Sequence, residues 1–437
     1  MKRRITPIVL LGAGVTGLLA TTFSAPFLAS KVESRLTELL QTAALAQTEL
    51  AQSVKQSVRQ AVIPEIELAE AVSTHFAVVA GGGAPSYNEI ALEKNVRYFQ
   101  RSLTEAGLNP SLASLFFANG NDGQATVRYL DENNRQQFKA PEIDELDGPA
   151  TYANTYGWFK AIAQAEKPCP AFFYFTGHGA YNPENEDNNS LILWEEAFVS
   201  VKEMAGWLDP LPADQPFVTM MAQCYSGAFA NLIYENGDPE QPVALQSRCG
   251  FFATVASRPS VGCTPAVNEA DYKDYSSSFF AGLTGRDRIG NPVSSADYNT
   301  DGKISYAEAH AFAKVDEETT DWPISTVEAW LQRQVEAADI TDILALPVDE
   351  LVAIARPEQQ YVINSLAELL GFDTSQSYLT NQERIGFPAE DTVEEAYHMR
   401  LQMELANVGI EQTIRDSQNL EQIAILEKIQ NCEAGSW

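Results

Sequence analysis

The chain has 437 residues, enough for one large domain with appendages or for two to three domains. Its 59 acidic and 29 basic residues give a net charge of −30, which argues against nucleic acid or an anionic membrane surface as the main partner because both would be repelled. Hydrophobic residues make up 45% of the chain, as in globular proteins, and five cysteines are too few for a disulfide-dense miniprotein.

The first thirty residues have the pattern of an export signal. Three basic residues, Lys2, Arg3 and Arg4, precede an uncharged and mostly apolar stretch that reaches residue 30. This pattern predicts a cleaved signal peptide or a single N-terminal membrane anchor, and therefore a periplasmic, secreted or otherwise extracytoplasmic protein. Residues 31–73 carry leucine and alanine at helical spacing, which predicts a helical stalk or pro-segment.

From residue 74 to 326, short apolar runs alternate with helical patterns. Such alternation predicts an α/β fold with a mostly parallel sheet and helices on both faces. From residue 327 to 437 only helical spacing continues, broken by prolines, which predicts a helical C-terminal region. The predicted strands are 76–80, 114–117, 171–175, 217–221 and 250–255, and the predicted helices between them are 88–106, 152–166, 201–208, 226–234 and 276–283.

A histidine and a cysteine directly follow two of these predicted strands. His178 follows the third strand and Cys224 the fourth, and the carboxyl ends of parallel strands meet at one edge of a sheet. A nearby imidazole can take the proton of a thiol and later return it to a leaving group. The backbone N–H groups of Gly179 and Cys224 are candidates for an oxyanion hole. Because Cys224 precedes a predicted helix, we expect the helix dipole to lower its thiol pKa.

The segments around both residues resemble motifs of known enzymes. Residues 173–179 (FYFTGHG) and 223–227 (QCYSG) look like the His and Cys motifs of the caspase-like clan of cysteine peptidases, which includes caspases, metacaspases, gingipains and legumains. Residues 76–88 resemble the first strand and loop of legumain-type peptidases, in which an Asn orients the catalytic His, and that position is Asn88. The resemblance spans roughly residues 74–315. It implies a caspase-like three-layer sandwich and an endopeptidase that acts through an acyl-enzyme.

The specificity residues of legumains are not all present in this chain. Legumains carry an Arg-His pair shortly after the Asn, and this chain has Ile90 and Ala91 there. In the clan, the segment after the fifth strand builds the pocket for the P1 side chain. Arg258 is our candidate for receiving an acidic P1 residue, and Asp271 and Asp274 are candidates for a basic one. The alternative is that these three are solvated loop charges.

Residues 297–308 (DYNTDGKISYAE) match the calcium-binding loop of an EF-hand. The expected ligands are side-chain oxygens of Asp297, Asn299 and Asp301, the backbone carbonyl of Lys303, Ser305 directly or through water, and the bidentate carboxylate of Glu308. A predicted helix follows the loop but none precedes it. We therefore expect one Ca²⁺ as a structural clamp, with control of activity as a further possibility, and an ordinary Asp/Asn-rich turn as the alternative.

Four further cysteines allow up to two disulfides, in three possible pairings, or remain free. They are Cys169, Cys249, Cys263 and Cys432, and the pair Cys249–Cys263 brackets the fifth predicted strand.

Two other function classes stay open beside hydrolysis of a protein or peptide substrate. One is a calcium-organised, catalytically weak binding or scaffold module. The other is a peptide ligase or transpeptidase, because an amine can resolve an acyl-enzyme in place of water. By analogy with the helical prodomain of legumains, we expect the C-terminal region to bind the chain's own active site.

Overall fold

The computed structural model describes residues 63–66, 68 and 74–437. The expected export signal lies outside the described residues, and so does the expected stalk apart from 63–66 and 68. None of the described helices is both long and apolar enough to cross a membrane.

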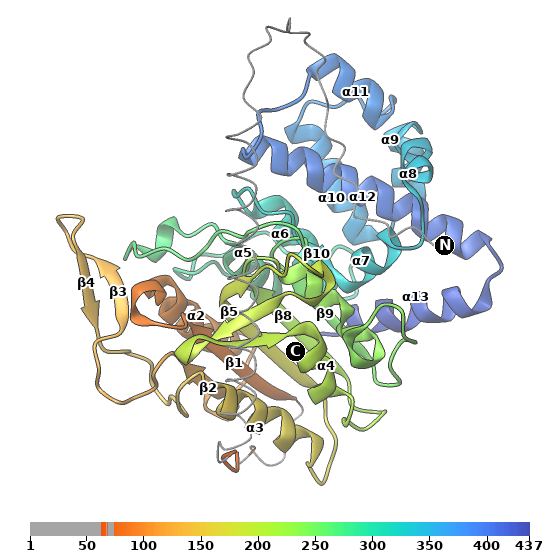
Figure 1. The fold of residues 1–437 in the computed structure, drawn as a ribbon. Helices are drawn as coiled ribbons and strands as arrows, with labels where there is room; N and C mark the ends of the chain where they lie inside the picture. The colour runs from red at the N-terminus through yellow and green to blue at the C-terminus, as the bar shows by residue number, and fades with distance from the viewer. Residues whose placement is uncertain (1–62, 67, 69–73) are drawn as a thin grey trace, which may run out of the picture. The chain divides into compact units, whose positions relative to one another are not determined.

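A mostly parallel sheet forms the centre of the structure (Figure 1). The strands of the described residues are β1 (His75–Gly81), β2 (Ser114–Phe117), β3 (Val127–Leu130), β4 (Gln136–Lys139), β5 (Ala171–Ala180), β6 (Ser190–Leu193), β7 (Ala197–Ser200), β8 (Phe217–Ala222), β9 (Arg248–Phe252) and β10 (Ile324–Ser325), of which β3 and β4 form a sheet of their own. Their order in the sheet is β10-β9-β8-β5-β1-β2, with β10 antiparallel to β9 and the others parallel. β1 is buried along its whole length, because helices cover both faces of the sheet.

Helices pack on both faces of this sheet, which confirms the predicted α/β architecture. The α-helices of the described residues are α2 (Ile90–Glu105), α3 (Tyr152–Ala163), α4 (Val201–Leu208), α5 (Tyr275–Thr284), α6 (Tyr306–Asp316), α7 (Thr326–Gln332), α8 (Ala337–Leu344), α9 (Val348–Ile354), α10 (Pro357–Leu369), α11 (Tyr378–Ile385), α12 (Val393–Asp416) and α13 (Leu420–Glu433). One core cluster joins α2, α5, α6, α7 and α13 to the sheet, and a second joins α3 and α4 to the opposite face.

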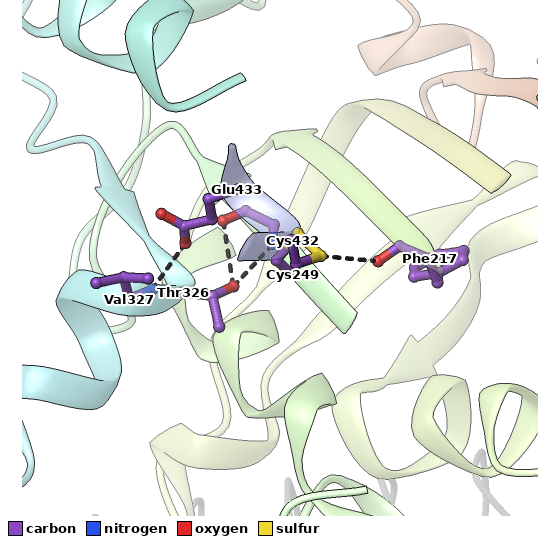
Figure 2. Close-up of a disulfide and its surroundings, with 7 residues drawn as sticks. Phe217, Cys249, Thr326, Val327, Cys432 and Glu433 are labelled. Atoms are coloured by element: carbon purple, nitrogen blue, oxygen red, sulfur yellow. Dashed lines mark hydrogen bonds between the residues drawn. A yellow bond between two sulfur atoms is a disulfide. The ribbon is translucent and has the colours of Figure 1, made fainter. Parts of the chain in front are cut away.

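The C-terminal helices belong to the same compact unit as the sheet, which extends from Pro64 to Trp437. Helices α8 to α12 share a hydrophobic cluster of their own, whereas α13 returns to the sheet beside β9 (Figure 1). A disulfide joins Cys249 of β9 to Cys432 of α13, with a Cα–Cα distance of 5.9 Å (Figure 2). The pairing Cys249–Cys263 is therefore wrong, since Cys249 has this other partner. The sequence boundary at residue 327 does not separate two independent bodies.

Some strands and helices differ from the sequence predictions, because tertiary contacts and not the hydrophobic periodicity determine the backbone conformation there. The polar stretch 119–149 contains the antiparallel hairpin of β3 and β4. β5 continues beyond the sheet and pairs with β6, which pairs with β7. The segment Ser226–Ile233 is a 3-10 helix rather than an α-helix, and it follows a left-handed residue, Tyr225, at φ 61°.

Candidate active site

The strand register brings the backbone beside His178 close to the backbone of Cys224. Thr176 of β5 is paired with Ala222 of β8, and each candidate residue stands two positions further along its strand direction. Gly179 packs directly on the next loop, since a Cβ at this position would lie 2.0 Å from the carbonyl oxygen of Cys224. Only glycine fits there, and its absence of a side chain lets the two strand ends approach each other.

Glu89, and not Asn88, is the polar partner of His178. Oε2 of Glu89 lies 3.0 Å from Nε2 of His178, and its other oxygen accepts a hydrogen bond from Arg128. The Asn88 side chain instead accepts from the backbone N–H of Gly82 at 3.0 Å and donates to the carbonyl of Thr126. The expectation that Asn88 orients His178 is therefore wrong. The adjacent residue, Glu89, contacts the histidine, and Asn88 stabilises the loop after β1.

Glu89 is charged and buried, with 2% of its surface exposed. Burial alone would raise its pKa, but the hydrogen bond and charge of His178, together with Arg128, outweigh it and lower the pKa below the ordinary value. Glu89 is also the residue before α2, yet its carboxylate does not cap that helix. Its two oxygens are therefore left for His178 and Arg128.

The Cys224 thiol is held by the backbone of Ser260. The Ser260 N–H donates to Sγ at 3.3 Å, and the thiol donates to the Ser260 carbonyl at 3.5 Å. Burial raises the pKa of Cys224, the Ser260 N–H opposes this effect, and the nearby charge of Asp321 adds to it. This contradicts the expectation of a lowered pKa, because burial and a carboxylate outweigh the short 3-10 helix that follows the cysteine.

The loop after β9 crosses the carboxyl edge of the sheet and forms a strap over the site. The Arg258 carbonyl accepts from the N–H of Tyr225, and the sulfur of Cys263 lies 3.6 Å from the carbonyl of Gly177 at the end of β5. Further along, the Thr264 carbonyl accepts from Ala91 at the start of α2. We call residues 256–266 the edge loop.

The edge loop brings Cys263 next to the histidine. Ligand atoms of Glu89, His178 and Cys263 all lie within 4.8 Å of one another. Cys263 forms no disulfide, and burial raises its thiol pKa well above the ordinary value, with the charge of Glu89 as a further cause. Within residues 63–66, 68 and 74–437, this is the cluster of three Cys, His or acidic side chains that meets this geometry.

Asp321 and Arg400 support the edge loop from the other side. Asp321 accepts from the Ser260 hydroxyl at 2.6 Å and from the Val261 N–H at 3.0 Å. Its carboxyl is completely buried, and burial raises its pKa to about 7. The guanidinium of Arg400, on α12, donates to the backbone carbonyl of Asp321 at 2.8 Å. Helix α12 therefore holds Asp321 in place, and Asp321 in turn holds the edge loop beside Cys224.

The three candidate P1-binding residues have partners within the protein. Arg258 lies with its guanidinium 4.0 Å from the ring centre of Trp322 and pairs with Asp391 at 3.2 Å, in the segment before α12. The buried Asp274 accepts from the Ser277 hydroxyl at 2.6 Å and lies 3.4 Å from Arg288. Asp271 is exposed and accepts from Asn268 at 2.8 Å. The two aspartates are therefore not brought together as one pocket.

The predicted calcium loop is formed, and its last three residues, 306–308, are the start of α6. Asp297 and Asp301 accept backbone N–H groups of the loop itself, and Asn299 accepts from the Asp301 N–H. Glu308 accepts from the N–H groups of Tyr298, Asn299 and Ser305, so its carboxylate faces the loop. The preceding residues 289–296 form no helix, as expected. The six oxygen-donating residues suit Ca²⁺, with Lys303 supplying its backbone carbonyl.

Two cavities of about 410 Å³ each lie elsewhere in the described structure than the His178 and Cys224 pair. One is lined by residues of α2 and the turn after α5, including Tyr98, Arg101 and Arg288. The other lies between α6 and α10 and includes Phe312 and Tyr361. Neither contains His178 or Cys224.

Comparison with known proteins gives little further information. No protein-family model matches the sequence, and no curated protein matches it. The crystal structure of protein GSU0716 from Geobacter sulfurreducens shows a remote likeness, with 12% identity and a TM-score of 0.32 over 55% of this chain and 88% of that chain. This likeness carries no argument about fold or function.

No sequence motif pointed to Glu89, Cys263, Ser260 or Asp321 as residues of this site. Glu89 had one available signal, since it adjoins Asn88 in the loop that resembles legumains. The other three follow no local pattern, because Ser260 and Asp321 meet across 61 positions of the chain.

Proposed function

We propose that this protein is an exported cysteine endopeptidase of caspase-like fold, closest to the legumain type. Cys224 is its nucleophile and His178 its general base. The observation that carries this proposal is the equal offset of the two residues beyond the paired Thr176 and Ala222, on adjacent parallel strands. Open α/β sheets place their sites at this carboxyl edge.

The contacts of His178 support a defined division of roles between its two ring nitrogens. Glu89 occupies Nε2, which leaves Nδ1 to take the thiol proton. As Sγ of Cys224 attacks the scissile carbonyl carbon, its proton passes to Nδ1, and the oxygen that becomes negative faces the backbone N–H groups of Gly179 and Cys224. The C–N bond then breaks, the imidazolium protonates the leaving amine, and a thioester remains. Water hydrolyses this acyl-enzyme.

Two features support the proposed setting of the enzyme. The Cys249–Cys432 disulfide suits an oxidising, extracytoplasmic compartment. The calcium loop is tied to the C-terminal helices, since Tyr298 of the loop stacks on Tyr361 of α10 with ring centres 4.1 Å apart. A bound Ca²⁺ at Asp297, Asn299, Asp301, Lys303, Ser305 and Glu308 would supply fixed positive charge that organises this joint.

One observation favours the binding-module alternative. A thiol that burial keeps neutral is a weak nucleophile, so the raised pKa of Cys224 suits a protein that binds rather than cleaves. For the peptidase proposal to hold, substrate binding must place Nδ1 of His178 where it can accept the proton of the Cys224 thiol. An amine acceptor in place of water would give the ligase reaction from the same thioester.

Labelling and turnover together test the proposal. The full chain in calcium is treated with a thiol-directed peptidyl ketone and with a peptide library varied at P1, beside Cys224→Ala and the control Cys169→Ser, which removes another free thiol. We expect labelling of Cys224, and cleavage that only Cys224→Ala abolishes. Cleavage that survives in Cys224→Ala would overturn the proposal, and absence of both labelling and cleavage would favour the binding module.

A further inference from the structure

The cluster of Glu89, His178 and Cys263 has a composition that the proposed peptidase reaction does not need. The reaction uses the histidine and its carboxylate, whereas Cys263 has no role in it. Cys263 is nevertheless brought from the edge loop to within 4.8 Å of both ligand atoms. The three residues come from three separate places, which are the start of α2, the end of β5 and the loop after β9.

We propose that Glu89, His178 and Cys263 form a binding site for a thiophilic divalent cation, of which Zn²⁺ is the representative. A carboxylate oxygen, an imidazole nitrogen and a sulfur are the three ligand types that Zn²⁺ takes in proteins. Bond lengths of about 2.0–2.3 Å in tetrahedral geometry place an oxygen, a nitrogen and a sulfur ligand roughly 3.3–3.6 Å apart. The upper limit of 4.8 Å in this structure requires only a small closing movement.

The surroundings of the cluster suit such an ion. Arg128 holds the other oxygen of Glu89, so the carboxylate that would face the ion is already fixed in orientation. The negative carboxylate and a cysteine thiolate would balance the two charges of the ion, and the Cys263 thiol would release its proton to solvent as the sulfur binds. Three protein ligands leave a fourth position open to water.

A cation bound at this site would inhibit the proposed peptidase reaction, a consequence that rests on the proposed function. The ion would bind Nε2 in place of the Glu89–His178 hydrogen bond, and the single ring proton of the neutral imidazole would then lie on Nδ1, so His178 could not accept the thiol proton. The site would therefore be an inhibitory one, distinct in position and ligand chemistry from the calcium loop, whose ligands are all oxygens.

A binding experiment independent of activity tests the site. The full chain, saturated with Ca²⁺ to fill the oxygen sites, is titrated with Co²⁺ and Zn²⁺ as probes. We expect a thiolate-to-cobalt charge-transfer band in the near ultraviolet for the wild type, for Cys169→Ser and for Cys224→Ala. The band should be absent in Cys263→Ser, with Zn²⁺ affinity at least tenfold weaker, since even outer-shell changes at metal sites cost about 10–100-fold.

An activity measurement on the same proteins separates the two proposals. We expect Zn²⁺ to inhibit peptide cleavage by the wild type and by Cys169→Ser reversibly on chelation, and Cys263→Ser to resist by at least tenfold. An unchanged cobalt spectrum in Cys263→Ser, or no binding by the wild type, would overturn the metal site and leave the peptidase proposal intact. Binding without any peptidase activity would overturn only the inhibitory role.

Discussion

The carboxylate of Glu89 is shared between His178 and Arg128, one oxygen for each, and it is almost completely buried. If the histidine is a general base, Glu89 is its positioning residue, and Glu89→Gln should lower kcat with little change in KM. The reduction should be about 10²–10⁴-fold, by comparison with orienting carboxylates in other nucleophile–histidine sites.

The variant Arg128→Gln distinguishes positioning of His178 by Glu89 from a general effect of the Glu89 substitution on stability. Arg128→Gln removes the partner of the other oxygen and leaves the His178 contact in place, so it should keep kcat within about tenfold of the wild type. Steady-state kinetics with thermal unfolding of both variants provide the measurement. If the two substitutions reduce kcat equally, Glu89 acts through the local fold and not through His178.

The reactivity of the Cys224 thiol should depend strongly on pH and on Asp321. Burial and the Asp321 charge raise the thiol pKa, so iodoacetamide labelling at Cys224 should rise about tenfold per pH unit between pH 7 and 9. Asp321→Asn removes the charge and should speed labelling at pH 7. Peptide mapping by mass spectrometry distinguishes Cys224 from Cys169 and Cys263. A flat rate between pH 6 and 9 would contradict the raised pKa.

The buried Asp321 should also make stability fall as pH rises. Its pKa in the folded protein is about 7, above the ordinary value of 3.8, so the folded state binds the proton more tightly than the unfolded state. The contribution is fully present below about pH 4 and is lost as pH rises through 7. A difference of about three units corresponds to about 4 kcal/mol at most.

The comparison of wild type with Asp321→Asn isolates this group from other buried carboxyls such as Glu433, whose pKa burial raises to about 8. Urea unfolding of both proteins from pH 4 to 8 gives the difference in unfolding free energy. As pH rises, the unfolding free energy of the wild type should fall relative to that of Asp321→Asn. A difference that is constant across this range would refute the raised pKa of Asp321.

Calcium should stabilise the chain through the carboxylate of Glu308. Saturation at 100 times the dissociation constant adds about 2.7 kcal/mol of unfolding free energy. Glu308→Gln keeps a side chain able to accept the N-cap hydrogen bond of α6 and removes the charge, so it should lose most of the calcium effect while the calcium-free protein stays close to wild type. Thermal unfolding with calcium and with chelator tests this, and an equal shift in both proteins would count against the site.

The ion pair of Arg258 with Asp391 should restrict substrates with acidic P1 residues. Asp391→Asn removes the competing carboxylate and should raise kcat/KM for Asp at P1 several-fold, with little effect on stability because the side chain of Asp391 is 84% exposed. Asp271→Asn serves as the control, because it removes one negative charge from a residue that has no contact with Arg258. No change in the P1 profile would remove Arg258 from the specificity residues.

The sequence by itself determined the features that depend on neighbouring residues. Buried parallel strands require continuous apolar runs, so β1, β5 and β8 could be predicted within a few residues. Those runs also predicted that His178 and Cys224 follow two strands; Cys224 does follow β8, whereas β5 continues past His178 to Ala180 by pairing with β6. The twelve-residue loop was equally visible, because its oxygen donors have fixed spacing along the chain.

Only the tertiary structure decided which distant groups meet. The Cys249–Cys432 disulfide joins residues 183 positions apart, and Arg258 meets Asp391 across 133 positions. The choice between Asn88 and Glu89 as partner of His178 depends on where the loop after β1 turns, and the raised pKa of Cys224 depends on burial by the edge loop. Packing and solvation fix these contacts, and neither has a period that a local pattern can reveal.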